Sequence, residues 1–62
     1  MNQPDDNVKI LSDQLDQGLR EIWLERAAIR QYDSGLSLEY AEALALLDLI
    51  RMDPAAVFAC WQ

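Results

Sequence analysis

The chain contains no histidine and a single cysteine, Cys60, among its 62 residues. Without histidine it can form neither a His/Cys zinc site nor a histidine-activated serine or cysteine nucleophile. A single cysteine also excludes an intramolecular disulfide and favours a reducing compartment. The two glycines, Gly18 and Gly35, stand too far apart for a phosphate-binding loop. These absences predict a protein that is not an enzyme and that binds no metal, cofactor or small-molecule substrate.

Positive charge is also scarce. Eleven acidic residues stand against five basic ones, which gives a net charge of −6. Binding to nucleic acid or to an anionic membrane surface requires clustered lysine and arginine, so we expect neither. The first residues lack the basic and apolar regions of a signal peptide, and no apolar run is long enough to cross a bilayer. We therefore expect a cytoplasmic protein.

Hydrophobic residues, in contrast, make up 52% of this short chain, and they are densest in residues 38–52, LEYAEALALLDLIRM. At helical spacing this stretch has two apolar faces. The first holds Tyr40, Ala43, Leu44, Leu47 and Ile50, and the second holds Leu38, Ala41, Ala45, Leu49 and Met52, with Leu46 between them. A surface helix needs one apolar face, so we expect protein to cover both, and an aspartate at position 47 to unfold the domain.

A second apolar pattern predicts one long helix over residues 8–32. At helical spacing its apolar residues lie within an arc of about 80°. They are Val8, Leu11, Leu15, Leu19, Ile22 and Ile29. Asp16 and Arg20 are spaced for an ion pair along this helix. Gly18, beside the stripe, would allow either a close helix approach or a slight kink. Trp23 lies at the edge of the stripe, and Leu24 points away from it.

The sequence from Asp33 to Gly35 ends that helix, because Asp, Ser and Gly favour turns and glycine closes helix C-termini. Ser37 then suits the N-cap of a second helix over residues 38–52. A connection this short predicts an antiparallel pair of helices.

The dipeptide Asp53-Pro54 ends the second helix and starts a short third one over residues 54–61, since proline favours the first helical position. Residues 1–7 are polar and predict a flexible lead-in. The expected fold is therefore all-α: an antiparallel helical hairpin with a third helix folded against it, forming a single small domain over residues 8–62.

Arg26 and Arg30 lie on or beside the apolar stripe and allow two interpretations. Their stems could cover apolar surface while their charges pair with Asp33 or with an acid of the second helix. Alternatively, they could anchor a protein interface, where arginine and aromatic residues are enriched. The candidate interface residues are Trp23, Leu24, Arg26, Arg30, Leu46, Leu49, Phe58 and Trp61.

One segment has a recognisable pattern. Residues 25–42, ERAAIRQYDSGLSLEYAE, resemble a segment of the form ERAAI-E-Y/F-DGG-LS-x-EAE found in small proteins and protein tails of phages and integrated mobile elements. Gln31 and Ser34 depart from that pattern, where an acid and a glycine are usual. The resemblance implies a mobile-element setting and assigns no functional residue.

These observations predict a small acidic protein-binding module that either self-associates as a homodimer or docks on one larger protein. The alternative is a phage-type inhibitor, of the anti-CRISPR or anti-restriction kind, whose acidic surface occupies a nucleic-acid-binding groove. Salt discriminates the two, because screening weakens a charged decoy much more than an apolar contact.

Overall fold

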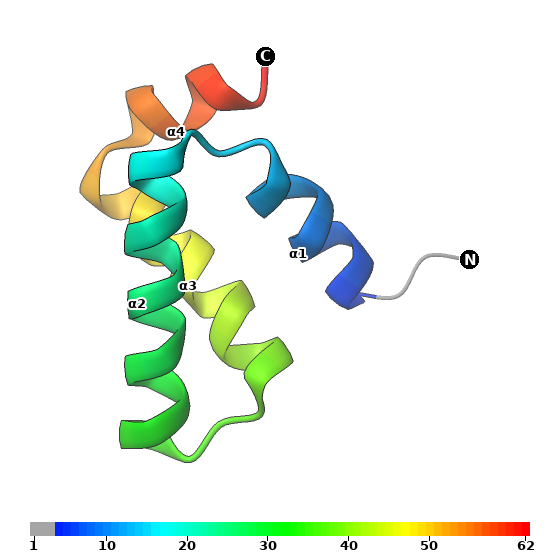
Figure 1. The fold of residues 1–62 in the computed structure, drawn as a ribbon, viewed down its shortest axis with the longest axis vertical. Helices are drawn as coiled ribbons and strands as arrows, with labels where there is room; N and C mark the ends of the chain where they lie inside the picture. Colours follow the sequence, from blue (N-terminus) through cyan, green and yellow to red (C-terminus); the bar gives the residue numbers. More distant parts are fainter. Residues whose placement is uncertain (1–3) are drawn as a thin grey trace.

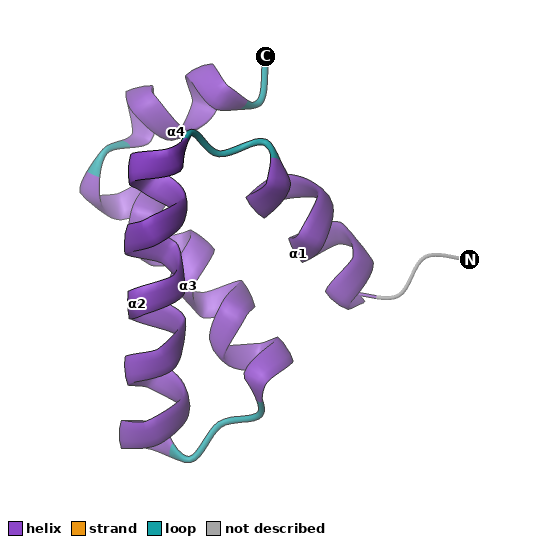
Figure 2. Cartoon of the chain, viewed as in Figure 1, coloured by secondary structure: helices purple, strands orange, loops and turns teal. Residues whose placement is uncertain are grey.

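The computed structural model describes residues 4–62 and the side chains of residues 7–62. This part of the chain forms helices (Figure 1) and contains no strand (Figure 2). The helices are α1 Pro4–Asp13, α2 Gln17–Ser34, α3 Leu38–Met52 and α4 Pro54–Cys60. The predicted all-α fold is therefore confirmed.

The first helix differs from the prediction at both ends. It begins at Pro4, so residues 4–7 of the predicted lead-in are helical, and residues 1–3 lie outside the described residues. The prediction of one helix over residues 8–32 is wrong, because the chain turns sharply between α1 and α2 (Figure 1).

Asp16 is the reason for this break. Its backbone is extended (φ −66°, ψ 168°), and its carboxylate accepts a hydrogen bond from the Leu19 amide at 2.8 Å, which makes it the N-cap of α2. The amides of Gln14 and Leu15 donate to carbonyls three residues earlier, at 3.3 and 3.2 Å, and so end α1. The apolar period continues through the break, which is why periodicity alone did not reveal it.

The expected ion pair between Asp16 and Arg20 is also replaced. Arg20 Nη2 instead lies 3.3 Å from Asp13 Oδ1, across the turn that Asp16 caps. The break allows α1 to pack against α3 rather than extend into solvent, with Leu15 buried at the turn.

The hairpin of α2 and α3 forms as predicted and has the most extensive contact between any two helices described. Gly35 takes the left-handed conformation (φ 65°) that ends α2, and the Ser37 hydroxyl accepts a hydrogen bond from the Tyr40 amide at 3.3 Å. The two helices cross at an angle, with α3 behind α2 in Figure 1. The almost fully buried Ala27 and Ala45 allow this close approach.

The last helix folds back and packs against α3, as the apolar content of residues 54–61 predicted. Asp53 caps it by accepting a hydrogen bond from the Ala56 amide at 3.2 Å, and Pro54 occupies its first turn. Val57 is fully buried, and the Trp61 indole donates to the Leu11 carbonyl at 2.9 Å. The C-terminal end of the chain is thereby tied to α1.

The core is formed by residues from every helix but α1, together with Leu15 of the turn. Its members are Leu15, Trp23, Ala27, Ala45, Leu46, Leu49 and Val57. The second predicted face of α3 supplies Ala41, Ala45 and Leu49 to the interior, whereas Tyr40 and Leu47 of the first face are exposed. A single copy of the chain therefore leaves part of the first face uncovered, and what covers it stays a prediction. None of the described helices combines the length and apolar character needed to cross a membrane.

Candidate protein-binding surface

Three of the predicted interface residues are core residues and not surface residues. Trp23, Leu46 and Leu49 are 5%, 5% and 1% exposed. Trp23 also donates its indole hydrogen to the Glu42 carbonyl of α3 at 3.0 Å, which fixes the hairpin. Although Trp23 lies at the edge of the apolar stripe, its large ring reaches the interior from there.

The other apolar candidates are not brought together. Leu24 is exposed on α2 and lines a groove facing α1. Phe58 is exposed on α4, where its ring meets that of Trp61 edge-to-face with 5.8 Å between centroids. Trp61 itself is half-buried by its bond to α1. These residues do not form one surface with the two arginines.

Arg26 and Arg30 meet at Asp48 of α3, which confirms the expected pairing with an acid of the second helix. Arg30 donates from Nε and Nη2 to the two Asp48 oxygens at 2.7 and 2.6 Å, a bidentate geometry. Arg26 Nε reaches Asp48 Oδ2 at 3.4 Å. The Asp48 side chain is 8% exposed, whereas those of Arg26 and Arg30 are 44% and 31% exposed. The carboxylate is buried, and both guanidinium groups keep solvent access.

This geometry shifts the pKa values of Asp48 and Arg30. The hydrogen bonds from Arg30 lower the pKa of Asp48; burial opposes this, and the attraction of both arginines adds to it. The same hydrogen bonds, which Arg30 donates to Asp48, raise the pKa of Arg30. Both shifts favour the charged forms of Asp48 and Arg30.

Two further residues of α3 complete this site. Arg51 and Met52 line an open hollow with Arg26, Arg30 and Asp48, and its volume is about 420 Å³. Three of the five basic residues of the chain thus surround one acid. Arg51 forms no ion pair within the part of the chain that the structure describes.

Helical spacing places further apolar side chains on the same sides of α2 and α3 as the residues that line the hollow. Ile22 and Ile29 lie one turn before and after Arg26 on α2, and both are exposed. On α3, Leu44 and Leu47 lie one turn before Asp48 and Arg51; Leu44 is half-buried and Leu47 is exposed. We call this surface the arginine face. It consists of Ile22, Arg26, Ile29, Arg30, Leu44, Leu47, Asp48, Arg51 and Met52.

Sequence reasoning named Arg26 and Arg30 but missed the rest of this face. One signal was present at Asp48, which at helical spacing lies beside the inner apolar face of residues 38–52. A carboxylate in that position must be paired, because an isolated buried charge is very costly. Nothing in the sequence indicates that Ile22 and Ile29 are exposed, because both belong to the apolar stripe that was predicted to be buried.

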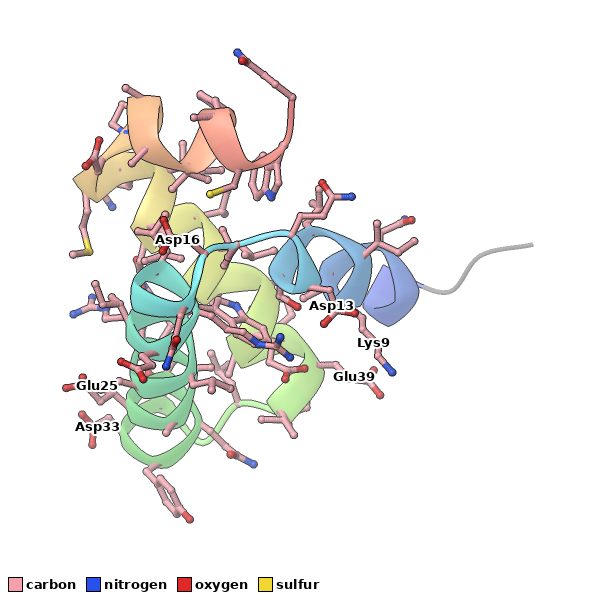
Figure 3. The ribbon with its side chains drawn as sticks, turned by 45° about the horizontal axis from the view of Figure 1, so that its top comes forward. Lys9, Asp13, Asp16, Glu25, Asp33 and Glu39 are labelled. Atoms are coloured by element: carbon pink, nitrogen blue, oxygen red, sulfur yellow. The ribbon has the colours of Figure 1, made fainter. Side chains whose placement is uncertain are left out.

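A second groove lies between α1 and the hairpin, and its charges are mixed. It has a volume of about 340 Å³ and is lined by Val8, Lys9, Ser12, Asp13, Arg20, Trp23, Leu24, Glu39 and Glu42. Figure 3 shows Lys9 and Asp13 of α1 on the same side as Glu39 of α3, while Glu25 and Asp33 project from the outer side of α2. Two bases and three acids line this groove, which leaves an excess of one negative charge, whereas three bases and one acid line the hollow.

No group of His, Cys, Asp or Glu side chains in the described residues is arranged to hold a metal ion. Comparison of the chain with models of protein families, with characterised proteins and with solved structures gave no match.

Proposed function

We propose that this chain is a small, non-enzymatic protein-binding module that contacts its partner through the arginine face. The observation that carries the proposal is the combination on this one face of exposed apolar side chains and partly exposed arginines. Interface cores are enriched in arginine, methionine and aromatic residues, and arginine is frequent among the residues that dominate binding energy.

The amount of exposed apolar surface supports the same proposal. Ten large hydrophobic side chains are exposed in the described residues, and four of them, Ile22, Ile29, Leu47 and Met52, belong to the arginine face. Isolated exposed apolar residues are common, but a contiguous group bordered by charge is typical of an interaction site.

The resemblance of residues 25–42 places this proposal in a setting. It is consistent with an accessory protein of a phage or mobile element, whose partner would be another protein of the element or of its host. Three residues of the resembling segment, Arg26, Ile29 and Arg30, belong to the arginine face.

Affinity capture from the native host tests this function. The bait is the purified chain, compared with Ile29→Ser on the arginine face and with Ile10→Ser on α1 as a control of similar exposure, 44% against 50%. We expect the Ile29 variant to lose its specific partner and the Ile10 variant to retain it. Equal capture by all three proteins would mean that the arginine face is not the binding surface.

The alternative function, an acidic decoy for a nucleic-acid-binding groove, is favoured by one observation. Because three bases surround Asp48, only Lys9 and Arg20 lie elsewhere, and seven exposed acids remain on the other described surfaces. They are Asp13, Asp16, Glu21, Glu25, Asp33, Glu39 and Asp53. A captured complex that dissociates by orders of magnitude between about 0.1 and 0.5 M salt would favour the decoy, since apolar contacts are hardly screened.

A further inference from the structure

We propose that the partner segment bound by the arginine face is an acidic amphipathic helix of another protein. A carboxylate of that helix enters the hollow beside Arg51, and its apolar residues pack against Ile29 and Leu47. This inference rests on the proposed function and specifies the chemistry of its partner.

The hollow has more hydrogen-bond donors than acceptors. Each guanidinium carries five N–H groups. Arg30 uses Nε and one Nη group on Asp48, Arg26 uses only Nε, and Arg51 makes no side-chain hydrogen bond in the described residues. Asp48 is the only acceptor side chain lining the hollow, and Arg30 already engages both its oxygens. Arg51 and the outer N–H groups of Arg26 are therefore placed to bind an added carboxylate in the bidentate manner that arginine favours.

The charges around the hollow define the direction of entry. Asp33 lies one turn beyond Arg30, and Glu25 lies one turn before Ile29, both on the outer side of α2 (Figure 3). They would repel a carboxylate approaching from that side. On the α3 side, Arg51 carries a positive charge with no ion-pair partner in the described residues, and the negative end of the α3 dipole and the exposed Asp53 lie beyond it. The acidic residue of the partner therefore has to reach Arg51 itself and not the end of α3.

Charge complementarity also excludes two other occupants. In a two-fold dimer formed through the arginine face, the arginine faces of the two copies would contact each other. The Arg51 side chain of each copy would then approach a surface with the same excess of positive charge. A nucleic acid would place many phosphates against a chain of net charge −6, with acidic residues at the edge of the site. One or two carboxylates on an apolar helix meet neither obstacle.

Fluorescence anisotropy with designed peptides tests the inference. The probe is a labelled helical peptide with leucines at every third and fourth position and glutamates flanking one side; a second peptide replaces each glutamate with glutamine. We expect the acidic probe to bind the wild-type chain at least about tenfold more tightly than the glutamine probe, because only a carboxylate forms charged pairs with Arg51. Equal affinities, or no binding of the acidic probe up to about 0.5 mM, overturn the inference.

A matched pair of variants locates the contact. Arg51→Glu and Lys9→Glu change the net charge equally, but only Arg51 lines the hollow, whereas Lys9 lines the groove at α1. We expect Arg51→Glu to weaken the acidic probe by about tenfold and Lys9→Glu to change it by less than about twofold. Circular dichroism confirms that both variants fold. Equal weakening would show a general charge effect and contradict the inference.

Three outcomes separate this inference from the proposed function. Ile29→Ser could abolish capture of the natural partner while the glutamate and glutamine probes bind equally. That result would support protein binding through the arginine face and contradict an acidic helix as the partner. If sedimentation shows a dimer that Arg51→Glu dissociates, the occupant is a second copy and the inference is wrong. Binding of labelled single-stranded DNA that Arg51→Glu abolishes would contradict both.

Discussion

Asp48 shows how one residue links the stability of the hairpin to its surface. Its carboxylate is buried, yet its two partners come from α2 and keep part of their side chains in solvent. Burial of a charge is tolerated here because both carboxylate oxygens accept hydrogen bonds from Arg30, and Oδ2 also accepts one from Arg26. The same bonds fix the two guanidinium groups at the rim of the hollow.

Asp48→Asn should destabilise the fold. The asparagine amide has one oxygen, so it cannot accept both hydrogen bonds from Arg30. The substitution also removes the negative charge that neutralises the arginines. Both arginines are partly exposed and can bind water instead, which limits the loss of stability. We expect a loss of about 1–2 kcal/mol in the free energy of unfolding, measured with urea at pH 7. Asp33→Asn, an exposed substitution on α2, is the control, with an expected change below about 0.5 kcal/mol. Similar losses in both variants would show that Asp48 does not stabilise the hairpin.

The lowered pKa of Asp48 also predicts a pH dependence. A carboxylate with a lower pKa in the folded state stabilises that state above its unfolded pKa, about 3.9. As the pH falls from there through the folded pKa, the contribution is lost. The stability difference between the wild type and Asp48→Asn should therefore be constant between about pH 6 and 7 and narrow below about pH 4. A difference that does not change down to about pH 2 would contradict this assignment.

At the scale of the element, the two apolar faces of α3 differ in how much of each is exposed to solvent. The middle of the second face, Ala41, Ala45 and Leu49, is buried, whereas Leu38 and Met52 at its two ends are exposed. On the first face, Tyr40 and Leu47 are exposed and Ile50 packs against the core. A helix can be apolar on both sides and still have one of them exposed when the protein is too small to surround it. The earlier expectation that an aspartate at Leu47 unfolds the domain is thus not supported for the single chain.

Alanine substitutions distinguish the two faces of α3. Leu49 is 1% exposed and Leu47 is 54% exposed. Leu49→Ala should lower the free energy of unfolding by about 2–4 kcal/mol, because it removes buried methyl groups and leaves a cavity. Leu47→Ala should cost less than about 1 kcal/mol. Thermal or urea unfolding of the two variants gives the comparison; a larger loss for Leu47→Ala would mean that a second copy or another element covers that face.

At the scale of the whole molecule, its thin shape accounts for the exposed apolar residues. The Cα atoms span 32 × 30 × 17 Å. Packed helix axes lie about 8–10 Å apart, so the shortest dimension holds two layers of helices and no third. No helix can then be enclosed on all sides, and surplus apolar surface remains on several of them.

Self-association remains a prediction at this scale. Exposed Ile10, Tyr40 and Phe58 lie outside the arginine face and could form a two-fold contact between copies. Sedimentation at micromolar concentration should then give about twice the 7.1 kDa mass of the chain. Arg51→Glu should leave that mass unchanged, and Phe58→Ser should lower it if α4 forms the contact. A folded monomer at that concentration would leave all of this surface to other proteins.

Local chemistry determined most of the secondary structure of this protein. Gly35, Ser37 and Asp53-Pro54 end and begin helices through bonds to their own neighbours, so their effect could be predicted without any tertiary contact. Asp16 acts in the same local way, but its capping role was hidden because an apolar period of helical spacing continued past it.

Only the tertiary structure decided which apolar and charged residues share a surface. Trp23 and Leu49 became core residues, while Ile29 and Leu47, with equally good helical periods, became exposed. The crossing angle of α2 and α3 determines this outcome and brings Arg26, Arg30 and Asp48 together from positions far apart in the chain. Periodicity defines a face of a helix, but the packing of that helix against its neighbours determines whether the face is buried.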